Sequence, residues 1–137
     1  MAIFKHLGML IGRLCICAIF LGSGINKIMD WDGVVQYMSN EGMTNIPLFL
    51  TLAIVCELLG GIFVLLGYWT RFGAFILLVF LGVVTYIFHD FWLFEGLAQV
   101  KEQVNFMKNL AIFGGVIYLL SAGPGKISVD GVRGKAD

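Results

Sequence analysis

The chain has 137 residues, of which 59% are hydrophobic and only 13% are charged. Soluble domains carry about 25% charged and about 45–50% apolar residues, so this composition excludes an ordinary water-soluble fold as well as disorder. Nine basic and nine acidic residues cancel, which leaves no net charge for binding nucleic acid. The length allows one domain, and its apolar residues are expected to face lipid.

Four apolar stretches are long enough to cross a bilayer as helices. At about 1.5 Å per residue the shortest covers about 25 Å, close to the roughly 30 Å hydrocarbon core. Backbone polar groups in lipid need internal hydrogen bonds, and none of the stretches alternates as a membrane strand would. The stretches are Leu7–Ile25, Ile46–Leu66, Phe72–Phe88 and Phe106–Ala122. The sequence therefore predicts an all-α bundle of four transmembrane helices.

Lysine and arginine residues predict the orientation of this bundle. Four spans place both termini on one side, and six basic residues fall on that side against three on the other. They are Lys5, Arg13, Arg71, Lys126, Arg133 and Lys135 against Lys27, Lys101 and Lys108. Because basic residues are retained in the cytoplasm, both termini are expected there. The first apolar run lacks a small-residue cleavage site, so its helix is expected to stay in the mature protein.

The connections and the carboxyl-terminal tail carry weaker signals. Asp32 is expected to cap a short turn that Gly42 ends. Four of its residues are expected to lie on the membrane: Val34, Val35, Tyr37 and Met38. Aromatic residues after His89 suit the lipid–water boundary. Pro124 and its flanking glycines end the fourth helix, which predicts a membrane domain of residues 1–125 and a loosely ordered cytoplasmic tail of residues 126–137.

Two ionisable residues lie deep in the predicted spans. Such residues are costly in lipid and are functional candidates by default. Glu57 lies near the middle of the second span, and Arg13 lies about two turns inside the first. Pairing would avoid two isolated charges in lipid, so we predict a buried ion pair between Arg13 and Glu57. This pair either fixes the helix register or takes part in a proton or redox step.

A second polar group is predicted at the outer side, where the first and third helices end and the fourth begins. Asn105, Lys108 and Asn109 are spaced i, i+3 and i+4, so they project from one helix face. With Lys27 and His89 they would surround an apolar wall suited to a quinone carbonyl or a small anion. Snorkelling of the lysines to lipid phosphates is the alternative. Three further residues are expected at the same depth: Asn26, Thr85 and Tyr86.

The residue pattern does not support haem binding, cysteine redox chemistry or metal binding by this chain alone. His6 and His89 fall on opposite sides of the membrane, so this chain alone cannot supply both axial ligands of a haem. Cys15 and Cys17 point to opposite faces of a helix and form neither a redox motif nor a metal clamp. No phosphate loop, catalytic triad or zinc spacing is present. Neither haem nor metal is therefore expected.

An ordered set of short motifs covers nearly the whole chain. It comprises Arg13 before Phe20-Leu21-Gly22-Ser23-Gly24 and Lys27, then Val35-Gln36-Tyr37-Met38 with Gly42, Cys56-Glu57-Leu58 with Gly60-Gly61, Leu66-Gly67-Tyr68-Trp69-Thr70-Arg71, His89, Phe106-Met107-Lys108-Asn109-Leu110-Ala111 with Gly114-Gly115, and Gly123-Pro124-Gly125 with Ser128 and Asp130. This set resembles the DoxX family of small four-helix inner-membrane proteins. The resemblance implies a bacterial inner-membrane location and, for the family's namesake, a small subunit of a thiosulfate:quinone oxidoreductase with a larger partner chain.

The resemblance also assigns positions. It places Arg13, Glu57, Lys108 and Asn109 on the family's polar intramembrane positions, and Lys27 and His89 at its outer end. The leading hypothesis is a quinone-linked redox membrane subunit that acts with a redox partner subunit or as a homo-oligomer, not as a catalyst alone. One alternative is a non-catalytic anchor or assembly module for a partner protein. Another is a small-solute conduit.

Overall fold

The computed structural model describes residues 2–135, and within that range it contains helices and connections but no strand. In chain order the elements are α1 (Ala2–Met29), α2 (Trp31–Asn40), α3 (Ile46–Leu66), α4 (Thr70–Phe88), the short 3-10 helix η1 (Phe91–Leu93), α5 (Gly96–Ala122) and α6 (Val129–Val132). Four of these helices, α1, α3, α4 and α5, are long and apolar enough to cross a membrane. The predicted all-α architecture with four spans is confirmed.

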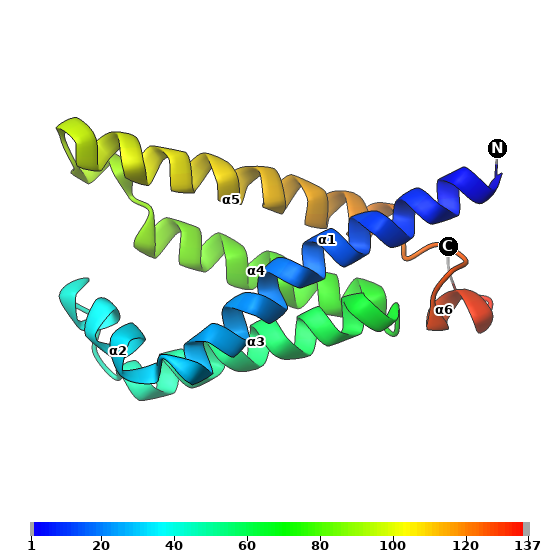
Figure 1. Cartoon of the computed structure of the whole chain (residues 1–137), viewed down its shortest axis with the longest axis horizontal. Helices are drawn as coiled ribbons and strands as arrows, with labels where there is room; N and C mark the ends of the chain where they lie inside the picture. Colours follow the sequence, from blue (N-terminus) through cyan, green and yellow to red (C-terminus); the bar gives the residue numbers. More distant parts are fainter. Residues whose placement is uncertain (1, 136–137) are drawn as a thin grey trace.

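The four long helices pack in a sequence rather than as a closed bundle. Helix α1 packs on α3, α3 on α4 and α4 on α5, whereas α1 and α5 share few contacts (Figure 1). Helices α2 and η1 lie at one end of the molecule, which we call the α2 end. The start of α1 and helix α6 lie at the opposite end, which we call the α6 end. Toward the α2 end, α5 diverges from α1.

Two glycines allow α3 and α4 to pack closely. A methyl group built on Gly60 would lie 3.1 Å from the carbonyl oxygen of Gly73, and one built on Gly73 would lie 3.1 Å from that of Gly60. Such small residues let membrane helices approach where lipid gives no hydrophobic drive for association. Beside this contact lies a core of buried residues from all four spans, including Cys17, Val64, Leu77 and Val116. This close packing fixes the relative positions of α3 and α4, which both contribute to the lining of the candidate site.

Helix α2 differs from the expected short turn. Asp32 lies inside its first turn and Asp30 occupies the cap position, so the prediction that Asp32 caps the turn is wrong. The apolar face of the helix packs partly on the protein. Met38 is buried, Val34 and Val35 are partly buried beside it, and Tyr37, which is 46% exposed, stacks on Phe88 with ring centroids 5.5 Å apart. Gly42 follows the helix with a φ of +75°, in agreement with its expected role as the stop.

The tail packs against the α6 end, so the expectation of loose order is wrong for residues 126–135. The Asp130 carboxylate accepts hydrogen bonds from the backbone N–H groups of Trp69 and Thr70 and from the Thr70 hydroxyl. Its own backbone N–H donates to Gly67, which lies in the turn between α3 and α4. Residues 136–137 lie outside the described range. Four polar contacts thus hold the tail where sequence composition alone favours a solvated end.

Candidate functional site

A partly buried ion pair joins α1 and α3. The Lys27 Nζ lies 3.0 Å from each carboxylate oxygen of Glu57, whose side chain is only 4% exposed. The ammonium also donates to the hydroxyl of Ser23, one turn earlier on α1. Lys27 therefore neutralises the carboxylate at mid-span, where an isolated charge would be costly.

The predicted Arg13–Glu57 pair is wrong. The Arg13 guanidinium instead donates to the backbone carbonyls of Pro124, at 2.9 Å, and of Ile127, at 3.0 Å. The cause lies in the register of the helices, because Gly24 contacts α3 at Glu57 and Leu58. Arg13, three turns earlier on α1, lies beyond the end of α3.

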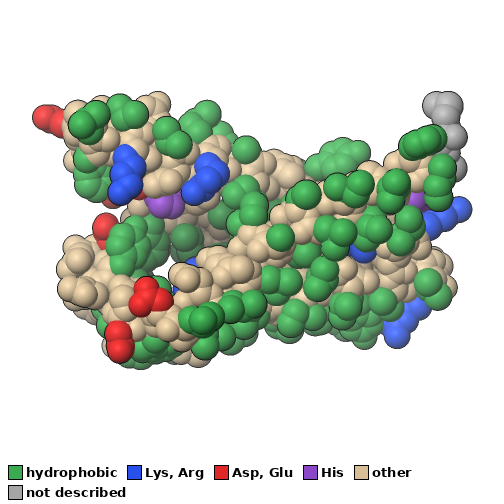
Figure 2. Space-filling view, in the orientation of Figure 1, with side chains coloured by type: hydrophobic (Ala, Val, Ile, Leu, Met, Phe, Trp, Pro, Cys, Tyr) green, Lys and Arg blue, Asp and Glu red, His purple; other side chains and the backbone are tan. Residues whose placement is uncertain are grey.

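A cavity of about 560 Å³ opens where α5 diverges from α1. Its polar lining consists of Ser23, Lys27, Glu57, His89, Lys108 and Asn109. Its apolar lining includes Phe20, Leu81 and Ile112. In the space-filling view, basic side chains and a histidine gather at the mouth of a hollow between α5 and the α1–α2 part of the molecule (Figure 2). One cavity between the membrane-crossing helices is thus lined by both charged and apolar side chains.

Of the five residues predicted to bind a ligand, the structure brings four to this cavity. Lys27, His89, Lys108 and Asn109 line it, while Asn105 lies one turn away on α5 and contacts Lys108. The three other residues that we expected at this depth do not line the cavity. Thr85 is buried and accepts a hydrogen bond from Asn109, Asn26 is exposed, and Tyr86 is 71% exposed beside Trp92.

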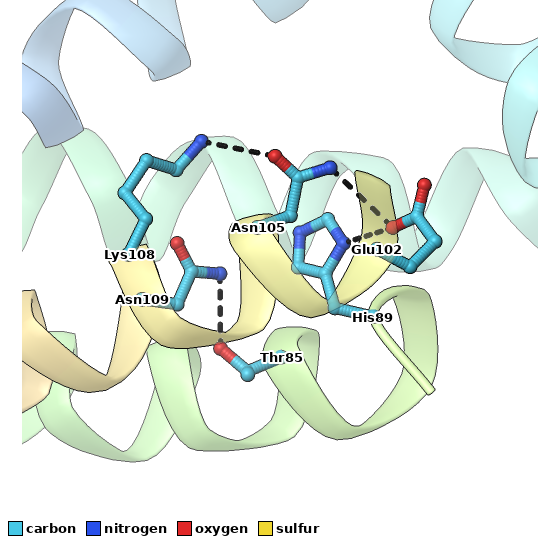
Figure 3. A network of polar contacts seen from close by, with 6 residues as sticks. All are labelled: Thr85, His89, Glu102, Asn105, Lys108 and Asn109. Atoms are coloured by element: carbon cyan, nitrogen blue, oxygen red, sulfur yellow. Dashed lines mark hydrogen bonds and ion pairs between the residues drawn. The ribbon is translucent and has the colours of Figure 1, made fainter. Parts of the chain in front are cut away.

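A chain of polar contacts extends along α5 (Figure 3). His89 Nδ1 lies 2.8 Å from Glu102 Oε2, which also accepts a 3.4 Å contact from the Asn105 amide. Lys108 donates to the amide oxygen of Asn105 at 3.5 Å. Because an ionised carboxylate only accepts, Nδ1 carries a proton and Nε2 remains for other partners. Figure 3 shows this second nitrogen pointing away from Glu102, toward the side of Lys108.

Sequence reasoning missed Glu102 as a partner of His89. The apolar run begins at Phe106, but α5 begins ten residues earlier, at Gly96, so the run marks only part of the helix. Glu102 and Asn105 are spaced i, i+3, and Asn109 follows four residues later, so one helix face carries all three. Extending the helix backwards through this polar face would have identified Glu102.

Lys108 is the cation most available to a ligand. Within residues 2–135 it has no carboxylate within 4 Å, and its 3.5 Å contact with Asn105 is long for a hydrogen bond. The other cavity lysine, Lys27, is already paired with Glu57. A second hollow of about 410 Å³, between α3 and α4, is lined by apolar residues and Cys56 and offers no charged group. The cavity beside Lys108 is therefore the candidate site.

Four membrane-crossing helices around a charged cavity define a small helical integral membrane protein. The DoxX family model matches residues 8–90, and the chain belongs to the DoxX family. A second model, that of the SURF4 family, matches residues 51–135. The chain is 35% identical over 122 residues to inner membrane protein YphA of Escherichia coli, covering 89% of this chain and 87% of that protein. It is an integral protein of the bacterial inner membrane.

Two further relatives show how much of each chain the sequence similarity covers. Inner membrane protein YqjF of E. coli is 32% identical over 131 residues, which cover 96% of this chain and 95% of that protein. The Surfeit locus protein 4 homolog of Schizosaccharomyces pombe is 35% identical over 69 residues, 49% of this chain and 23% of that protein. No solved structure matches the chain.

Proposed function

We propose that the protein is a quinone-linked redox subunit that holds a quinone head group in the cavity beside Lys108 while a partner oxidoreductase subunit exchanges electrons with it. One observation carries the proposal: the cavity brings the Lys27–Glu57 ion pair and His89, which Glu102 holds from outside the lining, together with an available lysine. The partner subunit is required because the cavity lining consists of side chains without redox chemistry of their own.

The dimensions and lining of the cavity suit this ligand class. Its volume of about 560 Å³ lies within the range of about 300–1,000 Å³ typical of small-molecule sites. Phe20, Leu81 and Ile112 provide apolar contact for a ring, and Lys108 and Asn109 provide hydrogen-bond donors for its carbonyl oxygens. An amphipathic ligand of this kind reaches the cavity from the membrane that the helices cross.

Proton movement is assigned to His89. A quinone takes up two electrons and two protons when it is reduced to a quinol. The partner subunit supplies both electrons. When His89 carries a proton on both ring nitrogens, it donates the Nε2 proton to one quinone oxygen, while Glu102 holds the ring by accepting from Nδ1. Water supplies the proton for the other quinone oxygen. The ammonium of Lys108 orients the carbonyl group and stabilises negative charge on its oxygen. Within this scheme the Lys27–Glu57 pair braces the floor of the cavity.

Quinone binding tests the proposal directly. Purified protein in lipid nanodiscs would be titrated with decylubiquinone and with a menaquinone analogue, each followed by equilibrium binding. We expect Lys108→Ala and His89→Ala each to weaken binding about tenfold, the effect of losing one hydrogen bond to a charged group. Lys101→Ala is the matched control, because Lys101 is an exposed lysine on the same helix outside the cavity lining. Unchanged affinity in both cavity variants would remove the proposed site.

The alternative is a non-catalytic anchor for a partner protein. It is favoured by the exposure of α5, in which only Asn109, Val116 and Leu119 are buried. Much of the surface of this helix is therefore free to contact another membrane helix. Cross-linking from exposed positions of α5 distinguishes the two functions. A stoichiometric partner in protein that binds neither quinone supports the anchor, whereas quinone binding that depends on Lys108 supports the redox subunit.

A further inference from the structure

A groove lies between α1 and α5 at the α6 end, remote from the proposed quinone site. The two helices meet where Ile16 packs at Gly115, 3.7 Å from the position of a methyl group built on that glycine. Beyond this contact they separate and leave a groove of about 280 Å³. Its charged side chains are Lys5 and Arg13, and its apolar lining includes Phe4 and Leu119.

Arg13 brings to this groove a buried positive charge that no carboxylate contacts directly. Its side chain is only 2% exposed, and its terminal nitrogens donate to two backbone carbonyls of the tail. Within residues 2–135 no carboxylate lies within 4 Å of the guanidinium, and Nε has no hydrogen-bond partner. The carbonyl dipoles and the more distant Asp130 carboxylate offset only part of this charge, so a further anion in the groove lowers the cost of burying it.

The groove lies where lipid headgroups are expected. It is at the end of the spans, and Tyr118, which lines it, is 71% exposed, as aromatic residues at a membrane boundary often are. Lys126 lies at the same end, because its backbone N–H contacts His6 of α1 at 3.4 Å. Basic residues between membrane helices at such a boundary are typical of sites for anionic lipid headgroups.

We infer that this groove binds an anionic phospholipid. The headgroup phosphate contacts the Lys5 ammonium at the rim and is attracted by the buried charge of Arg13. One acyl chain lies along the open faces of Gly8 and Gly12, where an added methyl group would meet no atom within 4 Å. The apolar walls favour a lipid over free phosphate, which has no chain to fill them.

Binding of defined lipids tests this inference without reference to quinone. The full-length protein in dodecyl maltoside would be mixed with phosphatidylglycerol, phosphatidylcholine or inorganic phosphate, and bound molecules would be counted by native mass spectrometry. We expect phosphatidylglycerol to bind more tightly than phosphatidylcholine, and Lys5→Gln to weaken its binding about fivefold. Lys5 is exposed, so this change leaves the packed core intact.

A steric variant with a matched control addresses the acyl chain. Gly12→Leu places a side chain in the groove and is expected to abolish the preference for phosphatidylglycerol. Gly22→Leu adds the same bulk to the same helix at another glycine with no neighbour within 4 Å, outside the groove lining, and should bind lipid as the wild type does. Equal binding of the two lipids, tight binding of inorganic phosphate alone, or unchanged binding in both Lys5→Gln and Gly12→Leu would each overturn the inference.

Discussion

At the scale of single residues, Lys27 and Glu57 are the pair on which the centre of the bundle depends. Glu57 is the more deeply buried partner, at 4% side-chain exposure against 22% for Lys27. Lys27→Met therefore leaves an unpaired carboxylate in the core and is expected to lower the free energy of unfolding by about 3 kcal/mol. Glu57→Gln leaves a lysine that still reaches Ser23, and should cost less, about 1–3 kcal/mol.

Unfolding by dodecyl sulfate, followed by circular dichroism, measures these effects. The double variant Lys27→Met/Glu57→Gln removes both charges and should be more stable than Lys27→Met alone. Arg13→Gln combined with Glu57→Gln provides the control, because these side chains share no hydrogen-bond partner and their effects should add within about 0.5 kcal/mol. Strong coupling between Arg13 and Glu57 would contradict the observed pairing.

Asp130 links the stability of the tail to pH. Burial opposes its ionisation, but hydrogen bonds from Thr70 and Trp69 outweigh that effect, and the pKa of Asp130 lies below its usual value. The unfolded state therefore binds a proton more readily than the folded state. The stabilisation is complete above the unfolded pKa of about 4 and is lost as the pH falls through the lower folded pKa.

Asp130→Asn isolates this contribution. The thermal unfolding midpoint of the wild type should exceed that of the variant at pH 7, and the difference should shrink as the pH falls below about 4. Circular dichroism of both proteins in detergent between pH 3 and pH 7 measures it. A difference in midpoint that stays constant across this range would show that the Asp130 carboxylate does not contribute through its charge.

At the scale of elements, the turn between α3 and α4 connects the bundle to its tail. Gly67 has a φ of +63°, and a methyl group built on it would lie against Ser128 Cβ and 2.6 Å from a terminal nitrogen of Arg13. Gly42, after α2, has a φ of +75° but no neighbour within 4 Å. Both Gly→Ala changes incur about 1–2 kcal/mol of backbone strain, and only Gly67→Ala also displaces the tail.

Trypsin cleavage after Lys126 reports on this displacement. Gly67→Ala should accelerate cleavage in residues 124–135 and lower the thermal unfolding midpoint by more than Gly42→Ala does. Gly42→Ala should leave the cleavage rate close to that of the wild type, because Gly42 lies at the α2 end. Equal effects of the two variants would mean that strain alone, and not the contact with Ser128 and Arg13, determines the importance of Gly67.

At the scale of the whole molecule, hydropathy predicted the spans because each span is a local property of the chain. The second predicted stretch, Ile46–Leu66, coincides with α3. Pairing across helices is not local, and there the prediction for Arg13 was wrong. The ends of the apolar runs do not give the relative depth of residues on two helices here, because α1 extends past the end of α3. The contact of Gly24 with Glu57 and Leu58 sets the register.

The spacing of side chains along one helix predicted more of the candidate-site residues than the expected depth of each residue in the membrane did. The i, i+3, i+4 pattern correctly placed Lys108 and Asn109 together, because neighbours on one helix face are fixed by helix geometry. The divergence of α5 from α1, which creates the cavity, arises from packing among all four spans and leaves no local pattern in the sequence. The sequence identifies Glu57 as a functional candidate, but only the three-dimensional structure shows that it lines this cavity.

Charge distribution over the whole molecule predicts how the bundle lies in the membrane. Five basic residues other than Arg13 belong to the α6 end, namely Lys5, Arg71, Lys126, Arg133 and Lys135, and the α6 end is therefore expected in the cytoplasm. A cysteine added at an exposed position, beside the three native ones, distinguishes the two sides without altering these charges: Val132→Cys in α6 or Ser39→Cys in α2.

An impermeant maleimide added to intact inner-membrane spheroplasts should label Ser39→Cys, and should label Val132→Cys only after the membrane is permeabilised. The wild type is the control, because its three cysteines lie within the spans α1 and α3. The reverse pattern would place the groove beside Lys5 and Arg13 on the periplasmic face. Labelling of both sites in intact spheroplasts would indicate a dual orientation, which the excess of basic residues at one end makes unfavourable.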